Sequence, residues 1–234
     1  MKLGILKTGQ PPESARPRFG DYPAMFRRLL GEDAYDYSTF AVDEGQWPAA
    51  PDACDAWLIT GASCGVYDPL PWIGALKGFL NDARGRAALV GVCFGHQVMA
   101  EAFGGKVIQS PKGWGVGEHD YRILSREPWM DGDDTLRLPA SHQDQVVELP
   151  PGAEVIAANA FTPMGALAWR DQPAISIQLH PEFEPAYATA LIEARRGTRY
   201  TPEQADQAIA SYGGPDDRAR VGGWIRKFLA AATL

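Results

Sequence analysis

A cysteine that ends an apolar run is the residue whose surroundings point most directly to chemistry. Residues 87–92 are apolar, and residues 91–97 read GVCFGHQ, where a helical pattern begins. This is the form of a nucleophile elbow, a strained strand-to-helix turn that leaves room only for small neighbours. The start of a helix favours the thiolate of Cys93, and the amide of Phe94 is expected to donate to a developing oxyanion.

A base for this cysteine must come from elsewhere in the chain. His180 follows the apolar run 174–179, so it is expected at the same edge of the sheet as Cys93. Glu182 is near enough to accept a hydrogen bond from the second ring nitrogen of His180, which fixes the tautomer. The sequence therefore predicts a catalytic triad of Cys93, His180 and Glu182.

The other histidines are weaker candidates for the base. His142 is the alternative, since Asp144 could orient it, but it follows an irregular segment and not a core strand, and therefore ranks second. His96 and His119 are expected to have structural or surface roles. Cys64 is expected to be a small loop residue near the active site.

Alternating apolar strands and helices must position these residues. The expected strands are residues 3–6, 35–42, 56–59 and 87–92, and the expected helices between them are 20–30 and 72–80. Continuous apolar strands separated by helices indicate a parallel sheet with helices on both faces. Ligands then bind at the carboxyl ends of the strands, where residues 60–63 read TGAS.

The pattern of apolar segments changes in the second half of the chain. From residue 105 to about 170 the segments are shorter, more polar and interrupted by glycine, with candidate strands at 107–108, 121–124, 136–138 and 155–158. These favour antiparallel or mixed pairing. Residues 174–179 return to a buried strand, and 185–234 are helical with breaks near 200 and 213–215. The expected fold is α/β, with a mostly parallel central sheet and a smaller mixed or antiparallel one.

Composition narrows the function classes. The chain has 234 residues and a formal charge of −7, which fits one domain, 1–234, and argues against nucleic acid as partner. The pairs at 27–28 and 195–196, both Arg-Arg, are interpreted as solvated helix faces. The three cysteines lack the spacing of a zinc site, so no metal or cofactor is expected. Without a signal peptide or membrane span, the chain is expected to be cytoplasmic.

Three motifs together resemble a known family. GVCFGHQ at 91–97, HPE at 180–182 and SHQDQV at 141–146 are similar to class I glutamine amidotransferases, nearest to stand-alone proteins like the glutaminase domain of GMP synthase. The resemblance implies a flavodoxin-like sheet. It also implies that Cys93 attacks the side-chain amide of glutamine, that His180 protonates the leaving ammonia, and that water cleaves the γ-glutamyl thioester.

The resemblance also implies an oxyanion hole. The loop with Gly61 and Ala62 occupies the place of the loop whose backbone completes this hole, together with the amide of Phe94. The sequence departs from the family pattern here, because the family often has glycine or serine at the position of Ala62 and commonly proline at that of Ser63. Any backbone amide can donate, whatever its side chain. The departure therefore leaves open which amide is the donor, but an oxyanion hole is still expected.

Substrate-binding residues follow from the same resemblance. Gln97 matches the glutamine that contacts the amino-acid head of the substrate, and His142 belongs to the SHQDQV motif. Residues 113–117, GWGVG, fall where a loop flanks the glutamyl group, which makes Trp114 and Gly115 candidates. A glycine-rich strand of this kind indicates a β-bulge equally well.

Three functions remain open on the sequence. The first is a glutaminase, either a free-standing hydrolase or a component that delivers ammonia to a synthase on another polypeptide, since no synthase domain is expected within these 234 residues. The second is a γ-glutamyl peptidase, since the same triad and acyl group serve a different leaving amine. The third is a catalytically silent binding or regulatory protein, against which the intact triad argues.

Overall fold

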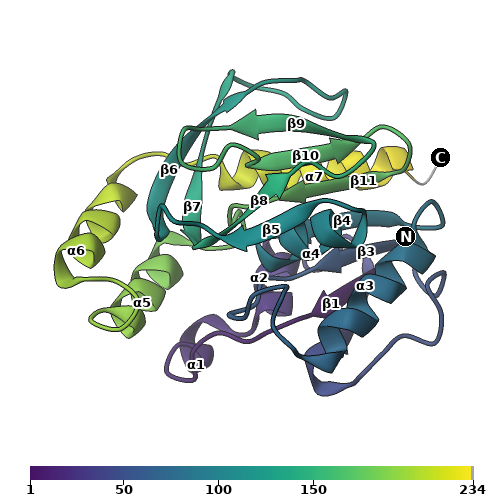
Figure 1. Cartoon of the computed structure of the whole chain (residues 1–234), viewed down its shortest axis with the longest axis horizontal. Helices are drawn as coiled ribbons and strands as arrows, with labels where there is room; N and C mark the ends of the chain where they lie inside the picture. Colours follow the sequence, from purple (N-terminus) through teal and green to yellow (C-terminus); the bar gives the residue numbers. More distant parts are fainter. Residues whose placement is uncertain (233–234) are drawn as a thin grey trace.

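Five parallel strands form the first part of the main sheet in the computed structural model, which describes residues 1–232 (Figure 1). In spatial order they are β2 (Asp36–Ala41), β1 (Lys2–Lys7), β3 (Ala56–Ile59), β4 (Ala88–Val92) and β11 (Ala174–Ile177). All residues of β3, β4 and β11 are buried, as expected for parallel strands covered on both faces. The predicted parallel sheet with flanking helices is confirmed.

Four antiparallel strands extend this sheet beyond β11. They are β10 (Ala166–Trp169), β9 (Ala153–Ala158), β6 (Gly115–Ile123) and β7 (Thr135–His142), and β7 is the outer edge. A small separate sheet pairs β5 (Lys106–Gln109) with β8 (Asp144–Glu148). The antiparallel part of the fold thus divides between the main sheet and the small one.

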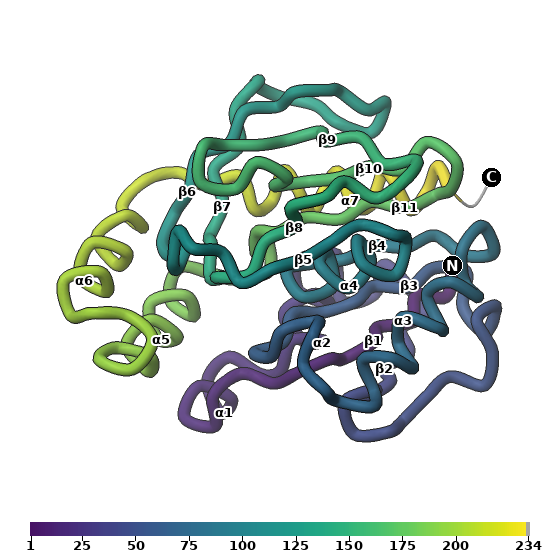
Figure 2. Tube along the Cα trace, viewed as in Figure 1, coloured from purple at the N-terminus to yellow at the C-terminus, as the bar shows by residue number. Residues whose placement is uncertain are grey.

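Helices cover both faces of the sheet. One face carries α2 (Tyr22–Leu30) and α7 (Arg218–Ala232), whose apolar side chains share one core cluster with β1 and β4. The other face carries α3 (Pro71–Ala83) and α4 (Phe94–Ala102), which pack in a second cluster with β3. Figure 2 shows the late helix α7 behind strands from the middle of the chain, so segments distant in sequence share one core.

A helical hairpin projects at one end of the sheet (Figure 1). It consists of α5 (Pro185–Arg195) and α6 (Pro202–Ala210), and α6 begins with a capping box between Thr201 and Gln204. Short helical turns complete the described structure: α1 (Arg16–Phe19), η1 (Val42–Glu44) and η2 (Ser211–Gly213). The hairpin lies beside β6 and β7, so it can form a wall at their ends.

The predicted elements differ from the structure mainly in the antiparallel part. Strands β8 and β10 were not predicted, and β6 and β7 are longer than expected. The segment before His142 was expected to be irregular, which is wrong, because His142 ends strand β7. Pro139 within β7 obscured this strand, and a proline is compatible with it because β7 is a sheet edge.

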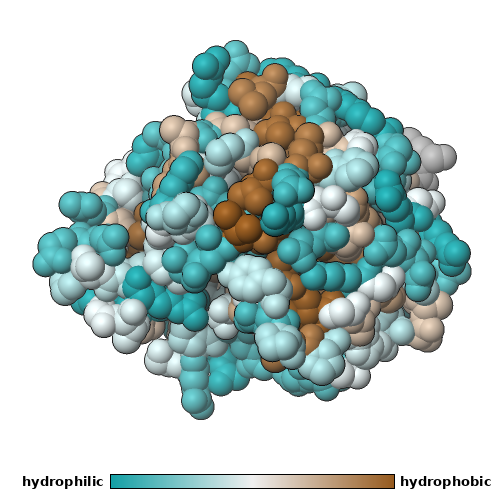
Figure 3. Space-filling model, in the orientation of Figure 1, coloured by the Kyte–Doolittle hydropathy of each residue, from teal (hydrophilic) through white to brown (hydrophobic). Residues whose placement is uncertain are grey.

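Hydrophobic residues on the face seen in Figure 3 form a strip among hydrophilic ones, over the region of β8 and β9. Val147 and Leu149, near the end of β8, are exposed large hydrophobic residues.

None of the helices within residues 1–232 combines the length and the hydrophobicity that a membrane span requires.

Candidate active site

Cys93 occupies a strained turn between β4 and α4. Its φ is +54° and its ψ −104°, and it is the only non-glycine residue with positive φ among residues 1–232. A Cβ on Gly91 would lie 2.5 Å from the carbonyl oxygen of Gly95, and one on Gly95 would lie 2.3 Å from that of Ile59. Both neighbours must therefore be glycine for this turn to form, as the elbow motif predicts.

His180 and Glu182 come together directly after β11. Nδ1 of His180 is 2.8 Å from Oε1 of Glu182, and both side chains are almost completely buried. The ring of His180 stacks on Phe183 with a centroid distance of 3.8 Å, and its amide donates to the carbonyl of Pro139. These contacts fix both the position and the orientation of the imidazole.

The imidazole also lies against the cysteine. A Cβ placed on Gly61 would be 3.3 Å from Cε1 of His180 and 3.8 Å from Cβ of Cys93. Burial opposes the charge on the imidazole, but the neighbouring Cys93 and Glu182 overcome it and raise the pKa of His180 to about 10. The structure thus brings the three predicted triad residues together, with His180 hydrogen-bonded to Glu182 and lying beside Cys93.

The loop after β3 lies beside both the cysteine and the imidazole. Thr8 anchors it, because its amide donates to Oγ1 of Thr60 at 3.0 Å and its hydroxyl lies 3.1 Å from the carbonyl oxygen of Gly61. Gly61 is in contact range of both Cys93 and His180, so a side chain there would crowd them. Phe94 is the first residue of α4, and its amide has no partner within the helix. Gly61 and Phe94 thus lie next to Cys93, and Ala62 lines the same pocket, while the oxyanion hole itself stays a prediction.

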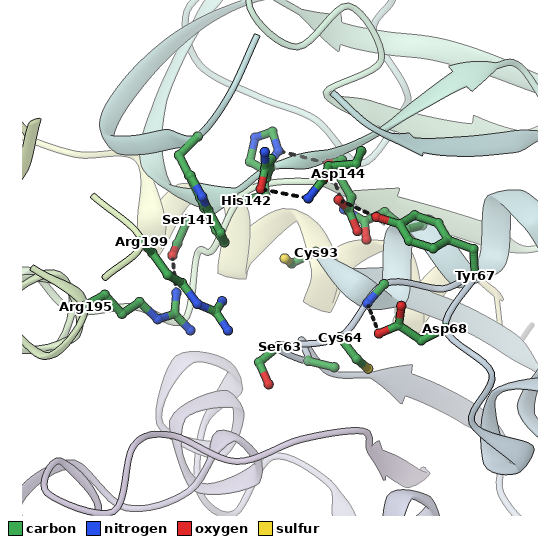
Figure 4. Close-up of a pocket in the computed structure, with 16 residues that line it drawn as sticks. Ser63, Cys64, Tyr67, Asp68, Cys93, Ser141, His142, Asp144, Arg195 and Arg199 are labelled. Atoms are coloured by element: carbon green, nitrogen blue, oxygen red, sulfur yellow. Dashed lines mark hydrogen bonds between the residues drawn. The ribbon is translucent and has the colours of Figure 1, made fainter. Parts of the chain in front are cut away.

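A pocket of about 360 Å³ opens above Cys93 (Figure 4). This volume is in the range of small-molecule sites. Cys93 is 6% exposed, so the sulfur reaches the pocket from a largely buried turn. Five parts of the chain line it: residues 62–68 except Val66, Cys93 with Gln97, Gln109 with Trp114, residues 141–144, and Arg195 with Arg199.

One wall of the pocket is acidic. Asp68 and Asp144 line it, and the Tyr67 hydroxyl donates to Oδ1 of Asp144 at 3.0 Å. The amide of Gly65 donates to Oδ2 of Asp68 at 3.0 Å. Burial, with a contribution from the negative charge of Asp68, raises the pKa of Asp144. Two carboxylates thus face the pocket close enough to repel each other.

The opposite wall is basic. Arg195 donates to the hydroxyls of Ser141 at 3.0 Å and Tyr200 at 3.4 Å, and the guanidinium of Arg199 lies over the ring of Trp114. Burial and the positive charge of Arg195 lower the pKa of Arg199. The prediction that Arg195 belongs to a solvated helix face is wrong, because α5 turns this side chain toward β7. Nothing in the local sequence pattern distinguishes Arg195 from a solvent-facing helix residue.

The predicted substrate-binding residues divide into two groups. Gln97, Trp114 and His142 line the pocket, and the side-chain amide of Gln97 donates to the backbone carbonyl of Asp144 at 2.9 Å. Gly115 is not among the lining residues. A Cβ there would lie 2.6 Å from the ring of Phe161, so its glycine serves strand packing.

His142 is held differently from His180. Its Nδ1 lies 3.1 Å from the backbone carbonyl of Asp144, whereas the carboxylate of Asp144 is bonded to Tyr67. Burial lowers the pKa of His142 to about 3, so this imidazole is neutral. Asp144 therefore does not orient His142 as Glu182 orients His180.

The remaining histidines and the loop cysteine have structural surroundings. His96 is completely buried and lies 2.8 Å from Oγ of Ser176, and burial lowers its pKa to about 3. His119 packs against Phe161. Burial raises the pKa of Cys64 to about 11, so its thiol is protonated. Among residues 1–232, no cluster of three or more histidine, cysteine or acidic side chains suits a metal ion.

The sequence is similar to a known family and to several of its proteins. A family model described as glutamine amidotransferase class-I matches residues 36–195. A glutamine amidotransferase-like protein of Schizosaccharomyces pombe is 28% identical, over 97% of this chain and 98% of that protein. γ-Glutamyl peptidase 4 of Arabidopsis thaliana is 30% identical, over 73% of this chain and 71% of its own length.

A solved structure has the same fold. It is described as a GMP synthase component of Thermoplasma acidophilum, and the match covers 99% of this chain and 94% of that one with a TM-score of 0.70. The sequence identity is 17%, so this likeness concerns the fold alone. The predicted resemblance is confirmed by the family match, which spans more than half of the residues, and this chain belongs to the class I glutamine amidotransferase family.

Proposed function

We propose that this protein hydrolyses γ-glutamyl amides with Cys93 as nucleophile. The sulfur attacks the γ-carbonyl carbon, and the amides of Phe94 and the loop at Gly61 and Ala62 stabilise the oxyanion. As the carbon–nitrogen bond breaks, His180 gives its proton to the departing amine. The product on the enzyme is a γ-glutamyl thioester.

Water completes the reaction. His180, now neutral, takes a proton from the attacking water, whose oxygen bonds to the thioester carbon. The carbon–sulfur bond then breaks, which releases glutamate and regenerates the cysteine. Glu182 keeps Nδ1 of His180 protonated, so that Nε2 faces the sulfur throughout. These reaction steps need no redox partner or cofactor.

The observation that carries the proposal is the site around the positive-φ cysteine. Cys93 is forced into a turn that only its glycine neighbours permit, and it lies against a buried His180–Glu182 pair. A strained backbone persists only where the surrounding structure over-determines it, and such positions cluster at active sites. A purely structural cysteine would not need this backbone conformation.

Glutamine is the simplest donor, and its ammonia would pass to a synthase partner. γ-Glutamyl peptides are the second candidate, supported by the 360 Å³ pocket and by the similarity to a protein named γ-glutamyl peptidase. Both donors present the same acyl group to the sulfur. They differ only in the leaving amine.

A donor screen on the purified chain tests this proposal. Glutamate release is measured from glutamine and from γ-glutamyl peptides, with ammonia and free amine quantified separately. We expect turnover that disappears in Cys93→Ala. Equal activity in the wild type and this variant would contradict the nucleophile assignment.

A silent regulatory protein on the same fold is the competing function. A glutamine-like diazoketone electrophile separates the two, because it alkylates an activated cysteine at the glutamyl site. We expect one adduct on Cys93, found by peptide mass spectrometry, and none on Cys64, whose thiol is protonated. An unlabelled Cys93, with and without candidate partners, would favour the silent protein.

A further inference from the structure

The arginine pair in the pocket has no carboxylate partner. Neither Arg195 nor Arg199 forms a salt bridge within the described part of the chain, whereas the adjacent Arg196 pairs with Glu193 and Asp206. Both pocket arginines are only partly exposed, and burial lowers the pKa of Arg199. Two half-buried cations that repel each other are held in place by neutral groups. Such an arrangement favours binding of an anion.

The two charged walls lie on opposite sides of the sulfur. Figure 4 shows Arg195 and Arg199 on one side of Cys93, and Asp68 and Asp144 on the other. A γ-glutamyl donor must place its γ-carbonyl carbon at the sulfur in the middle. Its acyl chain and its leaving amine then extend in different directions, toward different walls.

The acidic wall suits the head of the glutamyl group. Its α-ammonium group is a cation, and Asp68 and Asp144 are the carboxylates that face the pocket. The side chain of Gln97, the predicted contact for this head, is bonded to the backbone of Asp144. Because the ammonium and α-carboxylate share one carbon, an ammonium bound at this wall keeps the α-carboxylate on the same side of the sulfur.

The basic wall lies on the side from which the amine departs. Arg195 donates to the hydroxyl of Ser141 at 3.0 Å, and two residues earlier on β7 the carbonyl of Pro139 accepts the backbone amide of His180 at 2.9 Å, so the arginine lies on the His180 side of the sulfur. His180 is the proposed proton donor to the leaving nitrogen. The arginines therefore face the leaving half of the donor and not its glutamyl half.

We propose that Arg195 and Arg199 form a carboxylate-binding subsite that selects γ-glutamyl donors whose leaving amine is itself an amino acid. This rests on the proposed γ-glutamyl hydrolase function and names its substrate class. The preferred donors are γ-glutamyl peptides with a free carboxylate beside the scissile amide. Hydrolysis consumes water and yields glutamate and the free amino acid, whose nitrogen receives its proton from His180.

A matched pair of substrates isolates the subsite. γ-Glutamyl-glycine and its C-terminal amide differ only in the carboxylate, and glutamine lacks the group altogether. We expect kcat/KM of the wild type to be about 10- to 100-fold higher for the acid than for the amide, the effect of a hydrogen bond to a charged group. Equal values for acid and amide would overturn the subsite.

Substitution of the arginines should remove this preference. In Arg199→Gln and in Arg195→Gln/Arg199→Gln the acid-to-amide ratio should fall toward one, because kcat/KM for the acid falls more than kcat/KM for the amide. Arg196→Gln is the matched control, because it removes the same charge from a residue paired at the surface. A double variant that keeps the preference would contradict the proposal.

Labelling of Cys93 distinguishes the ways in which the experiment can fail. If the diazoketone labels the double variant at the wild-type rate, the glutamyl site is intact and a lost preference belongs to the arginines. If wild-type protein cleaves glutamine and both peptides equally, only the subsite is wrong. If it cleaves none of the donors and stays unlabelled, the hydrolase proposal itself fails.

Discussion

Nδ1 of His180 lies 2.8 Å from Oε1 of Glu182 in a site where both side chains are nearly inaccessible to water. A buried carboxylate beside an imidazole stabilises the imidazolium strongly, because little solvent screens the pair. This one contact connects the proposed chemistry with the pH dependence of stability.

Glu182→Gln should keep the hydrogen bond but remove the negative charge. We expect kcat to fall roughly 10³-fold, since the imidazolium formed during catalysis loses its partner. The measurement is glutamate release under saturating donor. A reduction smaller than tenfold would show that Glu182 is not needed to orient or charge His180.

Stability should also depend on pH through His180. Its folded-state pKa is raised to about 10 from an ordinary 6.5, so its contribution is complete below about 6.5 and is lost as pH rises toward 10. We expect the free energy of unfolding to decrease over this window, and to decrease less in Glu182→Gln. Denaturant titrations at pH 6, 8 and 10 compare the two proteins. Identical slopes would contradict the assignment.

At most positions alanine makes a protein more stable than glycine does, and the strained turn at Cys93 should reverse this order. Cys93→Gly should be more stable than Cys93→Ala by about 1 kcal/mol, because glycine adopts the positive φ without strain. Both variants should lose hydrolysis. Thermal unfolding of the two proteins provides the comparison, and a more stable alanine variant would argue against strain at this position.

Gly95→Ala should destabilise the protein severely. Its Cβ would lie 2.3 Å from the carbonyl oxygen of Ile59, a rigid backbone atom, so the expected loss is about 3 kcal/mol or more. Gly78→Ala in α3 is the matched control, because nothing lies within 4 Å of its added methyl. That variant should gain about 0.5 to 1 kcal/mol from helix propensity. Urea unfolding measures both.

His142 and His180 should respond differently to the same substitution. His180→Asn should abolish turnover, whereas His142→Asn should alter KM more than kcat, because its buried, neutral ring lines the pocket. Steady-state kinetics with γ-glutamyl-glycine separate the two effects. If His142→Asn lost turnover completely while keeping donor affinity, His142 would become the better candidate for the base.

The sequence predicted the parallel half of the fold well, because its strands are continuous apolar runs with distinct helices between them. The antiparallel half was less predictable. Strand β8 reads DQVVE and β10 has four residues, which gives too little pattern to distinguish strands from loops. Their pairing depends on distant partners.

The candidate site shows the same division. Local motifs predict the chemistry of two segments, the one with Cys93 and its glycine neighbours and the one with His180. Arg195 carries none, since its position in the pocket depends on how α5 pairs with α6 beside β6 and on the hydrogen bond to Ser141 at the end of β7. Tertiary packing, and not local sequence, brings the charged walls together.

The family match ends at residue 195, whereas the second pocket arginine is Arg199, in the turn that leads to α6. Cys93, His180 and Glu182, proposed to cleave the bond, and Arg195 lie within the matched segment, whereas Arg199, the other arginine of the proposed subsite, lies outside it. Exchange of residues 196–201, the turn between α5 and α6, for the turn of a relative should then change the choice of peptide donor while Cys93, His180 and Glu182 keep their positions.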